Sequence, residues 1–293
     1  MEESRKADIG PGPLAHPGHN ADAMNRLPTL LLGLALLAGA RTGAVEWEAV
    51  VPGVEHGRIL RDGFDAHAVR VDLDAACVAV VATPAADRGL TVSEFAARHG
   101  AVVAINGDYF DPALDPIGLA MGGGEVWAHA DERVRRQEVV GVGGRQVEIF
   151  PRAAPLRAPT PWMTGAISGW PMVVEDCAPV PKLPGSDHFT NAPHPRTAVG
   201  LSADRRSLLL VVADGRRENV PGPTLPELAA LLVEVGACTA VNLDGGGSSA
   251  LWLSGRIVNR PSDLVERPVA NHLAVVPAAD CTPGDASSRQ KAE

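Results

Sequence analysis

The chain carries the run Val241-Asn242-Leu243-Asp244-Gly245-Gly246-Gly247-Ser248-Ser249-Ala250-Leu251, in which polar side chains close an apolar segment and three glycines follow. Residues 239–243 alternate as a short strand does, so Asn242 and Asp244 point to one face while the apolar residues point into a core. Glycine permits left-handed dihedrals and lets backbone N–H groups approach a ligand closely. A tight turn between strands is the alternative, but a hairpin needs only one or two glycines and no Asn-x-Asp before them. The run therefore predicts a functional site.

The beginning of the sequence is typical of an exported protein. Residues 1–23 are polar, Arg26 precedes the apolar run 30–37, and Ala38-Gly39-Ala40 is a small-x-small cleavage site. The apolar run is too short to span a bilayer as a mature helix, so no stable membrane span is expected after cleavage. We expect an upstream segment and signal peptide over residues 1–40, one domain over residues 45–277 and a flexible tail over residues 278–293, in a periplasmic or secreted protein.

The net charge limits the possible partners of the protein, and the cysteines indicate its compartment. The formal net charge is −9 and no block of Lys or Arg offsets it, so nucleic acid is a poor candidate for a partner. The scattered cysteines Cys77, Cys177, Cys238 and Cys281 suit two disulfides in an oxidising compartment, with three alternative connectivities. Buried free thiols and, less well, a zinc site are the other interpretations.

Strand-like segments dominate the rest of the chain. Short apolar runs separated by Pro-rich stretches, with only two good helices among them, predict an α+β fold of mixed β-sheets with two principal helices in a single domain. The expected strands are residues 68–73, 78–83, 101–106, 138–142, 146–150, 197–201, 208–213, 239–243, 250–253 and 272–276. Residues 151–161, 179–195 and 221–226 are Pro-rich and are expected to be loops or sheet edges. Residues 121–127 are typical of a hairpin.

The two expected helices share one context. Residues 91–94 and 224–227 are capping boxes, in which Thr bonds the third helical N–H and Glu reaches back to the cap. Each opens an amphipathic helix, and a glycine and a strand that ends in Asn-x-Asp follow, at Asn106 and at Asn242. A duplicated helix-strand unit and the common grammar of helix caps both account for this. In either case both Asn-x-Asp sets lie beyond the carboxyl end of a strand, where open α/β sheets place ligands.

Six motifs follow one another along the chain: Ile105-Asn106-Gly107-Asp108-Tyr109-Phe110, His194-Pro195-Arg196-Thr197-Ala198-Val199-Gly200, Asp214-Gly215-Arg216, Thr224-Leu225-Pro226-Glu227-Leu228, the run 241–251, and Asn259-Arg260-Pro261-Ser262 with residues 266–272. In this order they resemble the phosphodiester glycosidase family, over roughly residues 45–277. The resemblance implies an α+β domain that hydrolyses a sugar-1-phosphodiester. The family includes an enzyme that removes N-acetylglucosamine from phosphodiester-capped mannose, and its bacterial members are often described as exopolysaccharide proteins, so the substrate does not transfer with the fold. The family often has an uncharged residue in place of Asp108.

Hydrolysis of a sugar-phosphate bond demands little proton transfer. The leaving group is a phosphate monoester whose second pKa is about 6. The usual pair of carboxylates then reduces to one essential carboxylate and groups that hold phosphate. We expect Asp244 to be that carboxylate, with Asp108 and Arg196 as further catalytic residues, since Arg grips two phosphate oxygens at once. The expected substrate-binding residues are Asn106, Asn242, Gly245, Gly246, Gly247, Ser248, His194, Asp214 and Arg267.

Several of these residues also have an ordinary structural interpretation. Arg196 suits a solvated strand edge, His194 an exposed loop, and Asp214 a tight turn between strands. No cofactor is expected, because the sequence has no His-x-His and Asp72-Leu73-Asp74 merely closes a strand; a structural calcium stays open. The alternatives to a hydrolase of the C1–O bond are a non-catalytic glycan-binding envelope module and a phosphodiesterase that cuts the P–O bond.

Overall fold

The computed structural model describes residues 45–278, except residues 62, 76, 130–136, 155 and 157. The expected upstream segment and signal peptide, and nearly all of the expected tail, lie outside the described residues. Within the described part, none of the helices has the length and apolar character needed to cross a membrane.

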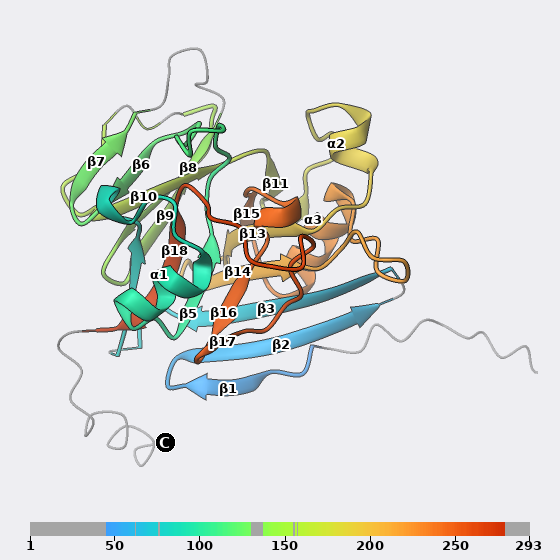
Figure 1. Ribbon diagram of the computed structural model, residues 1–293, viewed down its shortest axis with the longest axis horizontal. Coiled ribbons are helices and arrows are strands. Elements are labelled where there is room, and N and C mark those ends of the chain that lie inside the picture. The colour runs from blue at the N-terminus through green and yellow to red at the C-terminus, as the bar shows by residue number, and fades with distance from the viewer. Residues whose placement is uncertain are drawn as a thin grey trace, which may run out of the picture. The chain divides into compact units, whose positions relative to one another are not determined.

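Three β-sheets and three α-helices build the described part of the chain (Figure 1), which confirms the expected α+β class. All strand pairs among the described residues are antiparallel. In spatial order, the eight-stranded sheet is β1 (Glu48–Val51), β2 (Val54–Arg61), β3 (Phe64–Asp72), β14 (Ser207–Ala213), β13 (Arg196–Leu201), β15 (Thr239–Asn242), β11 (Met172–Glu175) and β12 (Ala178–Pro179). One five-stranded sheet is β7 (Glu125–Ala128), β6 (Ala120–Gly122), β10 (Gly165–Gly169), β8 (Glu138–Gly143) and β9 (Gln146–Phe150). The other is β17 (Arg256–Ile257), β16 (Leu251–Leu253), β5 (Val103–Asn106), β18 (His272–Pro277) and β4 (Val78–Ala82).

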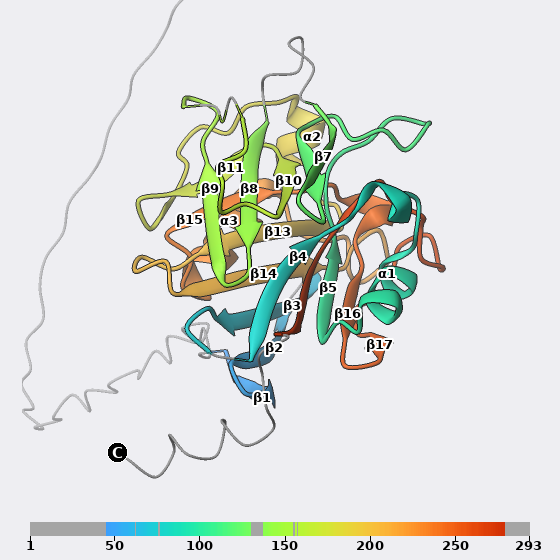
Figure 2. The same cartoon turned by 90° about the vertical axis from the view of Figure 1, so that its left-hand side faces the viewer.

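The eight-stranded sheet is buried on both faces, which explains the unbroken apolar sequence of β14. Leu208, Leu210 and Val212 face a central core that the two smaller sheets share. The β14 residues between them face α3 (Leu225–Glu234) in a second core. The helix α1 (Val92–His99) covers the outer side of β5 and β16 through Phe95 (Figure 2).

The two long helices begin at the predicted capping boxes, and all of the predicted strands and the hairpin of β6 and β7 are present. The helix α2 (Asp187–Asn191) differs from expectation, because it forms within the Pro-rich stretch that was expected to be a loop. The Ser186 hydroxyl accepts a hydrogen bond from the Phe189 N–H at 3.2 Å and so caps this short helix.

Cysteine pairing agrees with an oxidising compartment. A disulfide joins Cys177, in the β11–β12 turn, to Cys238 just before β15. Cys77 is also disulfide-bonded. Cys281 lies outside the described residues.

Antiparallel pairing places polar residues at strand ends in two of the sheets. Asn106 at the end of β5 lies opposite His272 at the start of β18. In the large sheet, Arg196 at the start of β13 lies opposite the last residue of β14, and Asn242 at the end of β15 lies opposite Ala198. The two sets of strand ends meet because the Asn106 side chain contacts the Asp244 carbonyl and the Thr197 hydroxyl.

Candidate active site

Asp244 lies just beyond β15 and is held through its backbone. Its N–H donates to the Gly107 carbonyl at 3.1 Å, and its carbonyl accepts a hydrogen bond from the Asn106 amide at 2.7 Å. The Gly245 N–H, at 2.9 Å, and the Ser248 hydroxyl donate to its carboxylate. The side chain is half-buried, and burial raises its pKa above the ordinary value. Asp244 is thus an oriented carboxylate that still reaches the surface.

Arg216 and Arg267 flank the Asp244 carboxylate. Their charges oppose the rise that burial causes in the pKa of Asp244. The Arg216 guanidinium lies over Gly246, where an added Cβ would stand 2.8 Å from Nη2, and it has no carboxylate partner among the described residues. Arg267 lies 3.4 Å from the Ser248 hydroxyl through Nη1. Arg267 is paired with the Asp263 carboxylate at 2.5 Å. Arg216 is therefore the cation beside Asp244 that no carboxylate of the described residues neutralises, as an anionic substrate requires.

Arg196 is a third cation of the site, and only 3% of it is exposed. Its guanidinium donates to the carbonyls of Phe189 at 2.8 Å, Ala192 at 3.1 Å and Pro223 at 3.4 Å, which fastens the segment around α2 to β13. Burial lowers its pKa to about 10, and the nearby Tyr109 opposes this change. The interpretation of Arg196 as a solvated strand edge is wrong. No carboxylate pairs with it among the residues described, so its charge is not neutralised within this region.

The three consecutive glycines admit three neighbours that approach the backbone. An added Cβ would lie 2.7 Å from the Pro195 carbonyl oxygen at Gly245, against a guanidinium at Gly246, and on the Asp263 carboxylate at Gly247. The Gly245 N–H donates to the adjacent carboxylate, and the Gly246 N–H donates to Pro195 at 2.9 Å. Two of the three N–H groups expected to hold phosphate are thus engaged within the protein. The absence of side chains at Gly245, Gly246 and Gly247 therefore lets other groups approach the backbone closely. Anion binding by the N–H groups of these glycines is the smaller part of their role.

Asp108 is a second carboxyl, and it is 2% exposed. Its Oδ1 accepts a hydrogen bond from the Ser168 N–H at 2.6 Å, and its own N–H donates to the Asn271 side chain at 2.7 Å. Oδ2 is buried and has no hydrogen-bond partner within the described part of the chain. Burial raises the pKa of Asp108 well above its ordinary value, and the charge of Asp244 adds to that rise. This raised pKa favours the protonated form of Asp108, which suits an acid role beside the Asp244 carboxylate.

The two asparagines expected to bind sugar differ in what their amides contact. The Asn242 amide nitrogen donates to the Tyr109 hydroxyl at 2.5 Å and to the Trp170 carbonyl at 2.9 Å, while its Oδ1 is buried without a partner among the described residues. The Asn106 amide has both ends engaged, because its nitrogen holds the backbone beyond β15 and its oxygen accepts a hydrogen bond from the Thr197 hydroxyl at 2.8 Å. Asn242 therefore retains an acceptor for a ligand, whereas Asn106 positions its neighbours.

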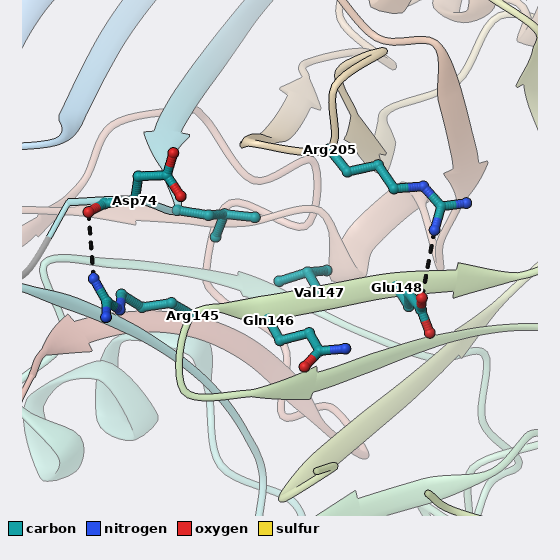
Figure 3. Close-up of a pocket in the computed structure, with 7 residues that line it drawn as sticks. Asp74, Arg145, Gln146, Val147, Glu148 and Arg205 are labelled. Carbon is teal, nitrogen blue, oxygen red and sulfur yellow. Dashed lines mark hydrogen bonds and ion pairs between the residues drawn. The ribbon is translucent and has the colours of Figure 1, made fainter.

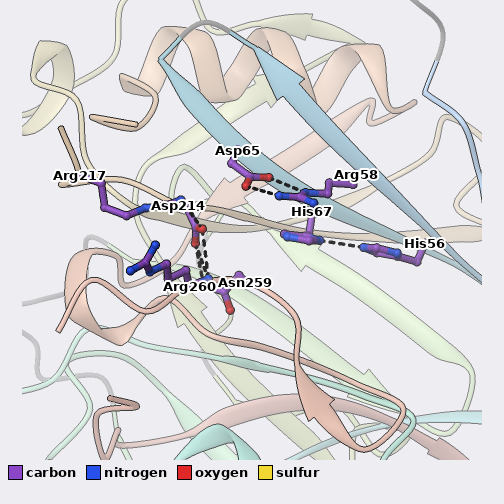
Figure 4. A network of polar contacts seen from close by, with 8 residues as sticks. All are labelled: His56, Arg58, Asp65, His67, Asp214, Arg217, Asn259 and Arg260. Carbon is purple, nitrogen blue, oxygen red and sulfur yellow. Dashed lines mark hydrogen bonds and ion pairs between the residues drawn. The ribbon is translucent and has the colours of Figure 1, made fainter. Parts of the chain in front are cut away.

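Asp214 belongs to a separate polar network (Figure 4). Its carboxylate accepts hydrogen bonds from the Arg260 N–H at 2.9 Å and the Asn259 amide at 3.1 Å, and it pairs with Arg217 at 2.8 Å. β14 ends at Ala213 and the next element is α3, so the expected tight turn between strands is wrong. Both oxygens of Asp214 fasten the segment after β17, and this geometry gives no support to substrate binding by Asp214.

His194 lies in the same cationic region. Its Nε2 is 3.3 Å from the His188 carbonyl oxygen, and its Nδ1 is buried without a partner among the residues described. Burial lowers its pKa, and the charges of Arg196 and Arg216 lower it further. His194 therefore offers a neutral imidazole rather than an additional cation.

Three residues without a role in the sequence argument belong to this region: Arg216, Tyr109 and Glu138. Arg216 and Tyr109 stand inside two of the motifs that carry the family resemblance, which is the signal that would have found them. Burial is the largest cause of the raised pKa of Tyr109. The charges of Asp244 and Glu138 add to the rise, whereas the charge of Arg196 opposes it. Nothing in the sequence around Glu138 marked it, because it opens an otherwise apolar strand.

The described residues also line a surface pocket of about 420 Å³ that shares no residue with this site (Figure 3). Arg205 donates to Glu148 at 3.4 Å there, and Arg145 donates to the Asp74 carbonyl at 3.3 Å. In the part of the chain that the structure describes, no group of three or more His, Cys, Asp or Glu is arranged to hold a metal ion.

This fold and site define an α+β protein whose centre combines buried carboxyls with cations. The chain belongs to the phosphodiester glycosidase family, whose profile matches residues 99–276, and the predicted family is thereby confirmed. It is 30% identical over 193 residues to N-acetylglucosamine-1-phosphodiester alpha-N-acetylglucosaminidase of Bos taurus, an alignment that covers 61% of this chain and 36% of the relative. The chain spans 13% to 36% of the length of the curated relatives that it matches.

Two solved structures show the same fold. The catalytic domain of the zebrafish N-acetylglucosamine-1-phosphodiester alpha-N-acetylglucosaminidase, auto-inhibited by its pro-peptide, matches with a TM-score of 0.63 and 21% identity, over 80% of this chain and 87% of that domain. A putative exported protein from Burkholderia pseudomallei matches with a TM-score of 0.54 and 19% identity, over 73% and 74% of the two chains.

Proposed function

We propose that this protein hydrolyses a sugar-1-phosphodiester by breaking the bond between C1 and the phosphate oxygen. The family supports glycosidase action on a phosphodiester. The observation that carries the finer proposal is the half-buried Asp244 carboxylate beside Arg216, a guanidinium with no carboxylate partner among the described residues. This pairing suits a reaction in which a carboxylate acts at carbon while a cation holds phosphate.

The roles follow from the contacts. Asp244 acts at C1 as nucleophile or as base toward water, and Arg216 binds the phosphate oxygens. Arg267, whose Nε and Nη2 are engaged by Asp263, contributes to phosphate binding only through Nη1. When the C1–O bond breaks, its electron pair stays on the phosphate oxygen and the oxygen of water ends on C1. The raised pKa of Asp108 makes this residue available as an acid, although a leaving group with a second pKa of about 6 hardly needs one. The free acceptor of Asn242 binds a sugar hydroxyl.

We further propose an N-acetylglucosamine-1-phosphate type of linkage in an envelope or exopolysaccharide glycan, and a periplasmic or secreted location. The name of the bovine relative supports the linkage. The Cys177–Cys238 disulfide and the exported structural neighbour support the location.

Hydrolysis of a panel of sugar-1-phosphodiesters in oxygen-18 water tests the proposal. Label in the C1 hydroxyl of the sugar, with unlabelled phosphate, is the expected result. Label in the phosphate would identify a phosphodiesterase instead. Binding without turnover of any member of the panel would identify a glycan-binding module.

A further inference from the structure

The side chain of Arg216, the cation proposed to bind phosphate, is not fixed by a carboxylate among the described residues. Its guanidinium is exposed and lies over the turn of residues 245–248, the glycine turn. Its backbone N–H donates to the Pro221 carbonyl at 2.9 Å, within the connection between β14 and α3. The place of the guanidinium therefore depends on how this connection is fastened to the glycine turn.

The Asn259 amide joins these two segments. Its nitrogen donates to the Asp214 carboxylate and to the Ser249 carbonyl, at 3.1 Å in each case. Asp214 stands two residues before Arg216 in the chain. On the other side, the Ser249 N–H donates to the Gly246 carbonyl at 3.2 Å, which closes the glycine turn. One amide thus connects the segment that carries the cation to the turn over which the cation lies.

Both members of this contact are buried and engaged within the protein (Figure 4). Asp214 is 2% exposed and Asn259 is 8% exposed. The Asp214 oxygens also accept hydrogen bonds from the Arg260 N–H, at 2.9 Å and 3.1 Å, and from Arg217 at 2.8 Å. The Asn259 oxygen accepts one from the Leu251 N–H at 2.8 Å. These contacts make the two side chains connectors between segments rather than substrate ligands.

We propose that Asn259 and Asp214 are positioning residues that hold Arg216 over the glycine turn and so form the phosphate site. This inference rests on the proposed function and adds what sets the place of its phosphate-binding cation. A buried hydrogen bond to a carboxylate is directional and stronger than one in water, so it fixes the two segments relative to each other. A displacement of about 1 Å in a positioned group can cost on the order of 10²-fold in rate.

Asp65 offers a matched comparison within the same network. It is 8% exposed, and Arg58 donates to its carboxylate at 2.7 Å and 3.0 Å. Its backbone carbonyl accepts a hydrogen bond from the Asp214 N–H at 2.8 Å. Among the described residues, however, Arg58 is the one hydrogen-bond donor to its carboxylate, and Arg58 belongs to β2. Loss of the Asp65 charge should therefore affect stability without moving Arg216.

Calorimetric titration of the full chain with inorganic phosphate, together with urea melts, tests the positioning role. Asn259→Ala should weaken phosphate binding about tenfold. Asp214→Asn should act in the same direction, because its new amide N–H turns toward the donors of Asn259 and Arg260. Asp65→Asn should also lose stability but should change phosphate affinity less than about twofold.

A double-mutant cycle with Arg216→Ala separates positioning from a general loss of structure. In the Arg216→Ala background, Asn259→Ala should still lower stability but should change phosphate affinity less than about twofold, because its effect on binding acts through the missing guanidinium. An equal loss of affinity with and without Arg216 would overturn the proposal.

Unchanged phosphate affinity in both Asn259→Ala and Asp214→Asn would also overturn it. If thermal melting shows that Asn259→Ala does not fold, the same cycle with Asp214→Asn decides. A wild-type chain that binds no phosphate would overturn both this role and the phosphate contact in the proposed function. A chain that shows the expected cycle but cleaves no diester would refute the proposed hydrolysis and support the positioning role.

Discussion

Arg216 lies across Gly246, so that a Cβ on that glycine would stand 2.8 Å from Nη2 and 2.9 Å from Nη1 of the guanidinium. Gly246 adopts a φ of 63°, in the left-handed region. The charge of Arg216 opposes the rise in the pKa of Asp244 that burial causes. A missing side chain thus lets a cation lie on the backbone beside the proposed catalytic carboxylate.

Replacement of Gly246 should separate conformational strain from substrate binding. Gly246→Ala and Gly144→Ala both place alanine at a φ near 60°, at a cost of about 1 kcal/mol in the free energy of unfolding. Only Gly246→Ala also displaces a guanidinium, because nothing lies within 4 Å of an added Cβ at Gly144. We expect similar losses of stability in urea melts, but a fall in kcat/KM for Gly246→Ala alone. Equal activities in the two variants would contradict the role given to Arg216.

Arg216→Ala and Arg196→Ala should differ in their effects on activity and on the free energy of unfolding. Arg216→Ala should raise KM and lower kcat/KM with little change in stability, because its guanidinium is exposed. Arg196→Ala should also lower the free energy of unfolding by about 1–3 kcal/mol, since the carbonyls of Phe189 and Ala192 lose their donors. Kinetics and denaturant melts of both variants check this. A stability loss in Arg216→Ala as large as that in Arg196→Ala would argue against the contacts described.

Asp244→Asn should reduce kcat on the order of 10³-fold while the fold and substrate binding stay nearly intact. The amide retains the shape of the carboxylate but cannot act as nucleophile or base. Kinetics on a cleaved sugar-1-phosphodiester, with Asp204→Asn at an exposed turn as the control, make the measurement. Full activity in Asp244→Asn would remove this residue from the mechanism.

Stability should depend on pH through Glu138. Burial raises its pKa to about 7 in the folded protein, against 4.5 when unfolded, so the folded state binds the proton more tightly. The resulting stability is present below pH 4.5 and is lost as the pH rises to 7. The glutamine in Glu138→Gln does not titrate, so this variant should not lose that stability. Between pH 4.5 and pH 7 the free energy of unfolding of wild type should fall by roughly 3 kcal/mol relative to that of Glu138→Gln. A difference that stays constant with pH would contradict this expectation, because the other carboxyls are common to both proteins.

The Cys177–Cys238 disulfide should stabilise the large sheet. It closes a loop with a sequence separation of 61, for which chain entropy in the unfolded state predicts about 4 kcal/mol. The double variant Cys177→Ala/Cys238→Ala should therefore unfold at lower urea concentration than wild type under non-reducing conditions. Detection of a reactive Cys177 thiol in unfolded, unreduced wild-type protein would show that the bridge does not form.

Local signals predicted the elements that depend on neighbouring residues. Both capping boxes join Thr to Glu three positions later, and both helices begin there. The strand β10 was missed, because Gly165 and Gly169 carry no apolar signal. Neighbouring segments pack directly against both glycines. An added Cβ would lie 2.9 Å from the Ala82 side chain at Gly165 and 2.5 Å from the Asn242 carbonyl oxygen at Gly169, so only the tertiary structure shows why glycine stands in this strand.

The sequence by itself determined the α+β class, the helix caps, and the position of Asp244 after an apolar strand, because these depend on periodicity and on short spacings. Only the tertiary structure decided what each polar group contacts. Asn106 and Asn242 look equivalent in sequence, yet one amide is fully engaged and the other keeps a free oxygen. Asp214 is engaged by residues 45 and 46 positions away. Hydrogen bonds are short-ranged and directional, so the partner of a polar side chain is set by which distant segments the folded chain brings within about 3 Å.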